Sequence, residues 1–327
     1  MSADIPVDYE AAAMQFLRGL RGKRSQRALS RRLGYRGNPI TDWEHGRRFP
    51  TAERAFAAAL RIHLDVANAF AAFHPTRPVL EPGRPIALAP WLDALRGSTS
   101  TADVARHTGL SRFAVRRYLA GEAKPRLPDF FRLVDAITGR LPELVAGLLP
   151  IEAMPVLRPR YEGLRAARRA AYDAPWTEAV LRILESPSYR ACVRHDDGFV
   201  AQRLGIDAAE VRASISLLRR ANVVVRRRRL YRPRDASSVD TRGDRAQVSA
   251  LLAHWTEVGR RHITGRKAPD LFAYNVFSLP DAELESARAI LARAFREVRA
   301  LVAAAEPGER VAVLNLQCFQ LGSAAKT

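Results

Sequence analysis

Hydrophobic residues recur at helical spacing along residues 91–150, and polar or glycine positions interrupt them at short intervals. This pattern predicts a series of about five short helices. Ser100 and Ser111 stand where helix N-caps are expected, and Gly109 stands where a helix ends in the left-handed conformation. The positions expected to be buried on the two middle helices are Val104, Ala105, Leu110, Val115, Tyr118 and Leu119. The stretch therefore predicts an all-helical unit in which two short helices meet at a glycine turn.

The same pattern occurs twice at a constant offset. Gly34 and Gly109 are 75 positions apart, and this offset aligns residues 16–75 with residues 91–150 without a gap. Identical pairs under this alignment include Leu17/Leu92, Arg21/Arg96, Ser25/Ser100, Gly46/Gly121, Pro50/Pro125, Phe56/Phe131 and Ile62/Ile137. Self-similarity at a fixed period indicates two copies of one structural unit. We therefore expect tandem domains at 1–75 and 91–150, joined by a proline-rich linker at 76–90.

One motif is present in both copies: a polar cap, a helix, a glycine turn, a second helix and the pattern G-x-x-x-P. Copy one carries it as SQRALSRRLGYRGNPITDWEHGRRFPT, with Ser25-Gln26, Gly34, Trp43-Glu44, Gly46 and Pro50 at the motif positions. Both copies resemble the lambda-repressor-like, or XRE-type, helix-turn-helix domains of bacterial transcriptional regulators. Copy two departs from the family pattern at Leu119, where Glu is usual, and at Thr101, where Gln is usual. The resemblance implies two DNA-binding units in one chain.

The second helix of the motif is short and carries small and basic residues, which suits the major groove of DNA. We expect copy one to contact DNA through Ser25, Gln26, Arg36, Asn38, Thr41, Arg47 and Arg48. We expect copy two to do so through Ser100, Thr101, Ser111, Arg112, Phe113, Arg116, Arg117 and Lys124. Arg can bind guanine, Asn suits adenine, and Phe can contact a thymine methyl group. Polar residues at the helix N-termini can hold a phosphate.

Alternatives remain open for these surfaces. Asp42 lies on the expected outer face of copy one, where it would repel phosphate, so it either accepts from a cytosine or pairs with an arginine. Any single arginine on these faces could instead be a solvated surface residue. One of the two copies could also have become a scaffold that supports the other.

The charge balance favours a polyanionic partner. The 327 residues include 53 Lys and Arg against 34 Asp and Glu, which gives a formal net charge of +19. No apolar run approaches the roughly 20 residues that span a bilayer, and the N-terminus lacks the basic start of a signal peptide. Two distant cysteines, Cys192 and Cys318, fit a reducing cytosol. We expect a cytoplasmic, nucleoid-associated protein whose partner is double-stranded DNA.

Residues 151–240 follow a different pattern. A helix that ends at Gly205, a helix that begins at about Ala208 and two short strands, NVVVRR and RRLYRP, resemble a winged helix. A basic wing would contact DNA through Arg226, Arg227, Arg228, Arg229 and Tyr231. Asp207 and Glu210, at the start of the second helix, would repel phosphate there. The alternative is a fold that docks the halves of the chain or forms a dimer.

Residues 241–327 show no further copy of the motif. Strand-like segments at 270–279 and 310–321 flank a helix expected at 281–305, an order that predicts a βαβ unit. The apolar stripe of this helix is expected to pack on the two strands, with a dimer seam as the alternative; it comprises Leu284, Ala287, Leu291, Ala294, Val298 and Leu301. The span 176–321 resembles an uncharacterised C-terminal domain of bacterial helix-turn-helix regulators. That resemblance implies a regulatory or dimerising role and no reaction.

Candidate catalytic and metal-binding groups are few. Cys192 lies near His195 and Asp197, but a buried cysteine and a helix-capping aspartate explain these residues better than a nucleophile does. His254, His262 and Glu257 could share a helix face, but this set lacks a further metal ligand at helical spacing. Glycine-rich phosphate-binding loops are missing from the sequence. We predict no enzyme, no metal and no cofactor.

The sequence thus predicts a mainly α protein with tandem lambda-repressor-like helix-turn-helix bundles, a winged helix and a small α/β C-terminal unit. We expect a sequence-specific DNA-binding transcriptional regulator that forms a homodimer, senses a small-molecule or protein effector through its C-terminal half, or does both. The alternative is a factor that docks proteins or binds nucleic acid, including RNA, without sequence preference.

Overall fold

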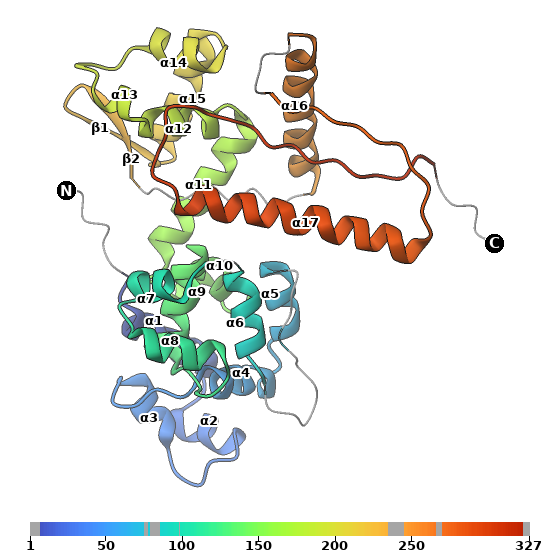
Figure 1. Cartoon of the computed structure of the whole chain (residues 1–327). Coiled ribbons are helices and arrows are strands. Elements are labelled where there is room, and N and C mark those ends of the chain that lie inside the picture. Colours follow the sequence, from blue (N-terminus) through green and yellow to red (C-terminus); the bar gives the residue numbers. More distant parts are fainter. Residues whose placement is uncertain are drawn as a thin grey trace. The chain divides into compact units, whose positions relative to one another are not determined.

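The computed structural model describes residues 7–74, 78, 86–97, 99–234, 245–265 and 270–322 (Figure 1). These residues are mainly helical, and their only sheet is a two-stranded hairpin. The chain divides into two compact units, Met1–Leu164 and Arg165–Thr327, and the division falls within the helix α11 (Arg158–Asp173). The predicted linker at 76–90 lies largely outside the described residues.

The first copy of the repeat folds into five helices. They are α1 (Tyr9–Arg21), α2 (Gln26–Arg32), α3 (Pro39–Glu44), α4 (Ala52–Arg61) and α5 (Val66–Phe73). Four of them begin at a side-chain cap, because Asp8, Ser25, Thr51 and Asp65 each accept a hydrogen bond from the backbone N–H three residues later. Such caps satisfy backbone donors that the first turn of a helix leaves unpaired.

The second copy repeats this order. Its helices are α6 (Ala89–Arg96), α7 (Thr101–Thr108), α8 (Arg112–Leu119), α9 (Leu127–Thr138) and α10 (Leu141–Ala146). The predicted caps Ser100 and Ser111 are confirmed, and Gly109 ends α7 at φ 70°. The equivalent glycines Gly22 and Gly97 end α1 and α6 with nearly the same backbone angles, φ 57° and ψ −134° against φ 58° and ψ −124°.

The two copies share one hydrophobic core. Phe16 of copy one meets Phe131 of copy two with ring centroids 5.7 Å apart, and Phe56 meets Phe130 at 5.3 Å. Phe70 contacts Trp91 edge to face at 4.7 Å. Truncation of one such buried ring to Ala costs about 3–5 kcal/mol. The copies therefore stabilise one another. A short 3-10 helix, η1 (Ile151–Ala153), follows copy two in the same unit.

The second unit begins with a compact helical body. It contains α12 (Thr177–Glu185), α13 (Pro187–Arg190), α14 (Asp197–Leu204) and α15 (Ala208–Arg220). The predicted turn is present, because Gly205 ends α14 in the left-handed conformation. The predicted stripe of α15, Val211, Ile215 and Leu218, is buried. Strands β1 (Val224–Arg227) and β2 (Leu230–Pro233) then pair antiparallel, with Arg227 opposite Leu230.

The rest of the unit corrects one prediction. It contains α16 (Arg245–Thr264) and α17 (Asp281–Ala304), but residues 270–279 and 310–321 form no strand, so the predicted α/β unit is wrong. A strand needs a neighbour for its backbone hydrogen bonds, and these segments have no strand partner among the described residues. The C-terminal segment is held by side chains instead: the amides of Asn315 and Gln317 donate to the Thr256 hydroxyl at 3.1 and 2.6 Å.

The apolar stripe of α17 does not pack on strands either. Leu284, Ala287 and Leu291 are half-buried, whereas Ala294, Val298 and Leu301 are exposed. Among the described residues, no helix combines the length and the apolar character that a membrane crossing requires.

Candidate nucleic-acid interface

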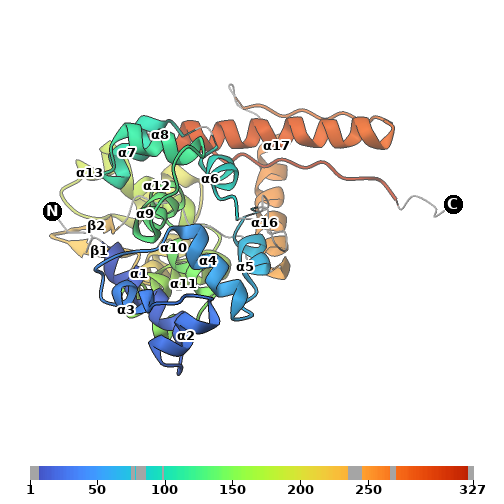
Figure 2. The same ribbon diagram turned by 90° about the horizontal axis from the view of Figure 1, so that it is seen from below.

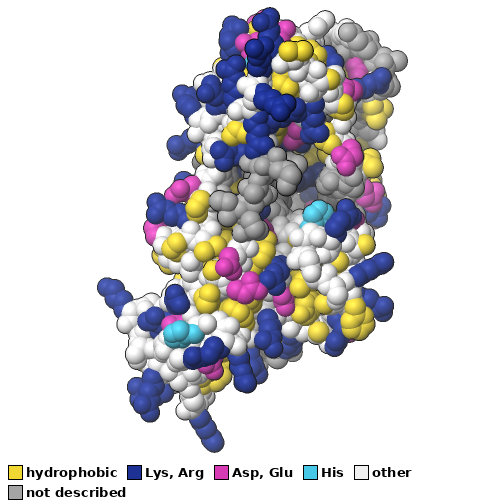
Figure 3. All heavy atoms as spheres, turned by 90° about the vertical axis from the view of Figure 1, so that its left-hand side faces the viewer, with side chains coloured by type: hydrophobic (Ala, Val, Ile, Leu, Met, Phe, Trp, Pro, Cys, Tyr) yellow, Lys and Arg dark blue, Asp and Glu magenta, His cyan; other side chains and the backbone are white. Residues whose placement is uncertain are grey.

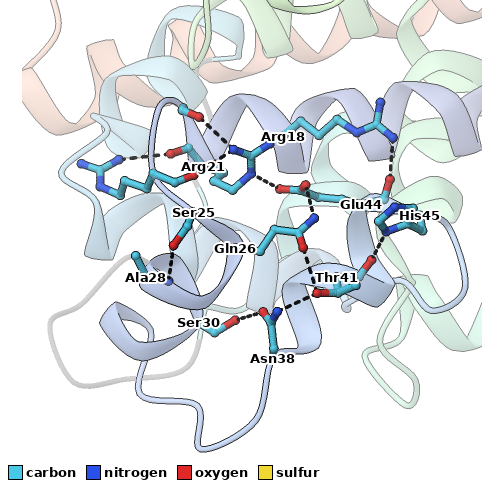
Figure 4. Close-up of polar contacts among 12 residues, drawn as sticks. Arg18, Arg21, Ser25, Gln26, Ala28, Ser30, Asn38, Thr41, Glu44 and His45 are labelled. Carbon is cyan, nitrogen blue, oxygen red and sulfur yellow. Dashed lines mark hydrogen bonds and ion pairs between the residues drawn. The ribbon is translucent and has the colours of Figure 1, made fainter.

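A chain of side-chain hydrogen bonds joins α2 to α3 in copy one (Figure 4). The Ser30 hydroxyl donates to Oδ1 of Asn38 at 2.7 Å, and Nδ2 of Asn38 donates to Oγ1 of Thr41 at 2.7 Å. Thr41 in turn donates to Oε1 of Gln26 at 2.9 Å, and Nε2 of Gln26 donates to Glu44 at 2.8 Å. Three predicted DNA-binding residues, Gln26, Asn38 and Thr41, are thus brought together.

These hydrogen bonds leave Asn38 with spare capacity. A primary amide has two donor hydrogens and two acceptor lone pairs, and Asn38 uses one of each within the protein. Asn38 is exposed, so the remaining donor and acceptor face solvent. A bidentate contact with adenine needs one donor and one acceptor. The network therefore orients this side chain without exhausting it.

Glu44, at the buried end of this network, is not among the residues that were predicted to contact DNA. Glu44 is 2% exposed, and its carboxylate accepts from Nε of Arg21 at 2.6 Å as well as from Gln26. Arg18 adds a hydrogen bond to the Glu44 backbone carbonyl at 2.8 Å. The only feature of the sequence that pointed to Glu44 is its position in the helix-turn-helix motif. It fixes the end of α3 against α1.

The cations of copy one are of two kinds. Arg36 and Arg48 are exposed and have no hydrogen-bond or ion-pair partner among the described residues. Arg47 pairs with Asp42 at 2.8 Å, which confirms arginine pairing as the alternative for that aspartate. Both side chains of this pair are well exposed, so the pair contributes little stability and can open.

In copy two, α8 exposes three of its four predicted contact residues, whereas Arg117 is half-buried and pairs with Glu122 at 3.9 Å. Arg112 and Arg116 are exposed, and their side chains make no hydrogen bond or ion pair with the described part of the chain. Phe113 is 68% exposed, and the Arg117 guanidinium lies 5.6 Å from the centre of its ring. A ring this exposed buries little apolar surface when the chain folds, so it adds little to the stability of the fold. The inner face is anchored by Val115, which is fully buried.

Tyr118 also anchors α8. Its hydroxyl donates to Asp129 at 3.2 Å, and burial together with this carboxylate raises the pKa of Tyr118. The inner face of α8 is therefore anchored by Val115 and Tyr118, and its outer face is left to solvent. Lys124 is exposed in the loop that follows.

The predicted phosphate contacts at the helix N-termini differ between copies. Ser25 and Ser100 are both exposed, and both accept a backbone N–H as caps. The Ser100 hydroxyl also donates to Asp103 at 2.6 Å, which places a carboxylate beside the start of α7. Thr101 is half-buried next to it. The first turn of α2 has no acidic side chain, so it disfavours an anion less than the start of α7 does.

The β1–β2 hairpin presents arginines at its tip. Arg226, Arg227, Arg228 and Arg229 are exposed, and the two-residue turn places Arg228 at φ 55°. Tyr231 is half-buried, and the guanidinium groups of Arg219 and Arg226 lie 5.8 and 5.9 Å from the centre of its ring. The Tyr231 ring is therefore packed against neighbouring side chains, Arg219 of α15 among them, whereas the arginines of the turn are exposed. Figure 3 shows dark-blue Lys and Arg side chains outnumbering acidic ones on the face that it presents.

A buried tyrosine anchors this hairpin. The Tyr189 hydroxyl lies 2.9 Å from Nδ1 of His195 and accepts from the Tyr231 backbone N–H at 3.1 Å. Nε2 of His195 lies 2.7 Å from Asp197, and burial raises the pKa of Tyr189 to about 12. Cys192 instead donates to the Ser188 carbonyl at 3.4 Å. His195 and Asp197 therefore connect the hairpin to α14, a role that the sequence did not indicate.

Two residues that were considered as metal ligands in the sequence, Glu257 and His254, interact with other side chains. Glu257 accepts from Arg260 and Arg261, which lowers its pKa to about 2. The His254 ring packs edge to face on Trp176 and Trp255, and burial lowers its pKa.

Residues 164–321 match a protein family described as a domain of unknown function, DUF4423. The matched segment coincides closely with the second compact unit, Arg165–Thr327. No curated protein and no solved structure matches the chain.

Proposed function

We propose that the protein is a sequence-specific double-stranded DNA-binding transcriptional regulator whose two repeats are lambda-repressor-like helix-turn-helix units. The observation that carries the proposal is the outer face of α8, where Arg112, Phe113 and Arg116 project unpaired from a helix anchored by Val115. An α-helix with its side chains is about 10–12 Å in diameter, so α8 fits a major groove about 12 Å wide. In that position Arg116 would bind guanine and Phe113 a thymine methyl group.

Copy one offers a second surface of the same kind. Asn38 keeps one donor and one acceptor, and Arg36 and Arg48 flank it with unpaired charge. We assign α3 and α8 as the two recognition helices, and the N-terminus of α2 as a phosphate contact.

In the second unit we propose a winged helix made of α14, α15 and the β1–β2 hairpin. The arginines of the hairpin turn are exposed, which supports contact with the phosphate backbone. Glu210 in the first turn of α15 disfavours insertion of that helix next to phosphate. The wing would therefore add affinity without base recognition.

The C-terminal half would form a homodimer, bind an effector, or do both. Large apolar side chains are exposed along α17 and the segments that flank it. They include Leu271, Tyr274, Val276, Leu301, Val302, Phe319 and Leu321. Apolar surface of this extent marks an interaction site in a folded protein. We assign it to a second copy of the chain.

The test is selection of bound sequences from a random duplex pool, with the full chain at physiological salt. We expect a defined motif. Arg116→Ala should relax the preference at one base pair, by about 1–3 kcal/mol of discrimination, and leave the other positions unchanged. Arg158→Ala is the control, because it removes the same charge from an exposed position of α11 outside both repeats. A pool that stays random while binding remains tight would instead favour charge-driven association with DNA or RNA.

A further inference from the structure

Two backbone hydrogen bonds join the copies of the repeat in a reciprocal way. The Ala52 N–H donates to the Pro125 carbonyl at 2.9 Å, and the Leu127 N–H donates to the Pro50 carbonyl at 3.0 Å. Ala52 and Leu127 are equivalent positions of the repeat, as are Pro50 and Pro125. Each copy therefore gives the other the same hydrogen bond that it receives.

The positions between these two hydrogen bonds, Thr51 and Arg126, lie on either side of the symmetry axis. Thr51 and Arg126 form an antiparallel bridge, and they too are equivalent positions. An antiparallel contact between a position and its own equivalent, with reciprocal hydrogen bonds on either side, is the pattern of a two-fold axis that passes between them. The two copies thus form a pseudo-dimer within one chain, and they are not related by a simple translation along it.

The packing of the helices agrees with this axis. Helix α4 packs on its equivalent α9, and α5 packs on its equivalent α10. Figure 2 shows α2 and α3 on one side of the first unit and α7 and α8 on the other, with α4 and α9 between them. The aromatic core is common to both copies, so they pack as one body.

The axis also relates the two proposed recognition helices. The loops that follow α3 and α8 both end at the bridge, because Pro50 and Pro125 close them. Two helices related by a two-fold axis meet a duplex with opposite polarity, so the sites that they contact are inverted with respect to one another.

We propose that one chain, without a second copy, binds a bipartite DNA site whose two halves are inverted and unlike. The halves differ because equivalent positions carry different chemistry: Asn38 stands where copy two has Phe113, and Thr41 stands where it has Arg116. The halves also have a fixed spacing, since the shared core sets the distance between α3 and α8. This inference rests on the proposed function, and it specifies the arrangement of the site and the number of chains that occupy it.

The experiment uses the full chain and the motif obtained from the selection. Three duplexes are compared: the selected site, the same site with one half reversed, and the same site with five base pairs, about half a helical turn, inserted between the halves. We expect reversal and insertion each to weaken binding by about 100-fold. Because the full chain is also proposed to dimerise through α17, native mass spectrometry uses the Leu301→Glu variant, which should be monomeric, and we expect one chain of this variant per bipartite site. Asn38→Ala should alter the preference in one half only, and Arg116→Ala in the other half only.

The outcomes separate this inference from the function. A motif whose halves are bound equally well in direct and inverted order would overturn the pseudo-dimer arrangement and leave sequence-specific binding intact. Two chains of the Leu301→Glu variant on one bipartite site would overturn it as well. A selection without any motif would reject the proposed function itself, and the inference with it.

Discussion

Nε of Arg21, on α1, donates to Oε1 of Glu44 at the end of α3 across 2.6 Å, and the Glu44 side chain is 3% exposed. The second carboxylate oxygen of Glu44 accepts from Gln26 at 2.8 Å. Both oxygens of a buried charge are thus paired, which is the condition under which such a charge is tolerated. This contact positions α3, the proposed recognition helix of copy one, relative to the core.

Replacing Glu44 should therefore destabilise the first unit. Leu is a suitable replacement, because Leu119 occupies the equivalent position in copy two. There Arg96, the equivalent of Arg21, pairs with Asp93 instead. In Glu44→Leu the guanidinium of Arg21 and the amide of Gln26 lose their partner, and we expect a loss of about 1–3 kcal/mol in the free energy of unfolding. Urea denaturation followed by circular dichroism measures it. Asp93→Ala, which opens a more exposed pair, should cost less than about 1 kcal/mol, and equal losses would contradict this assignment.

Helix ends were predictable from the sequence because caps are local. Ser100 and Ser111 cap the helices for which they were predicted, and Gly109 ends α7 in the left-handed region. The repeat could also be predicted, since it requires only an alignment. The two-fold relation of the copies could not, because the bonds between Pro50 and Leu127 depend on long-range packing.

The conformation of the C-terminal segments could not be predicted from the sequence. Residues 310–321 have the composition of a strand, but strand composition reports how a side chain fits a sheet and does not supply the neighbouring strand. In the candidate site, the type of each outer residue was predictable. That the side chains of Asn38 and Thr41 would be joined to Gln26 could not be predicted, because two separate helices, α2 and α3, meet there.

The hairpin should act on DNA through charge alone. Arg227→Ala together with Arg228→Ala removes two exposed cations from the turn. If both neutralise phosphates, the slope of log affinity against log salt should fall by about 2, since each contact contributes about 0.9. Base preference should stay unchanged. Fluorescence anisotropy at several salt concentrations measures the slope. An unchanged slope, equal to that of Arg158→Ala, would mean that the wing does not touch DNA.

The stability of the second unit should depend on the protonation of Glu185. This residue is 5% exposed, and burial raises its pKa although Arg182 pairs with it at 2.7 Å. A raised pKa means that the folded state favours the protonated acid. Its contribution is complete below the usual value of 4.5 and is lost as the pH rises through the folded value.

Glu185→Gln removes this dependence. Relative to the unaltered chain, the variant should gain stability between pH 4 and pH 7, by a few tenths of a kcal/mol to about 1 kcal/mol. Thermal unfolding at the two pH values measures the difference. Glu162→Gln, at a well-exposed position of α11, provides the control. A relative loss of stability at pH 7 would show that the pairing with Arg182 outweighs burial.

The exposed face of α17 should hold two copies of the chain together. Leu301 is 70% exposed and Val302 is 66% exposed, and we expect Leu301→Glu to convert a dimer into a monomer because it places a charge in an apolar interface. Ala292→Glu is the matched control: nine residues along a helix turn it by about 180°, so position 292 lies on the opposite side of α17. Analytical ultracentrifugation measures the change. Since each chain already contains both recognition helices, the monomeric variant should keep its affinity for a single bipartite site and lose only cooperative binding to two. A monomer that no longer binds one site would show that the two copies of the repeat do not suffice for DNA recognition.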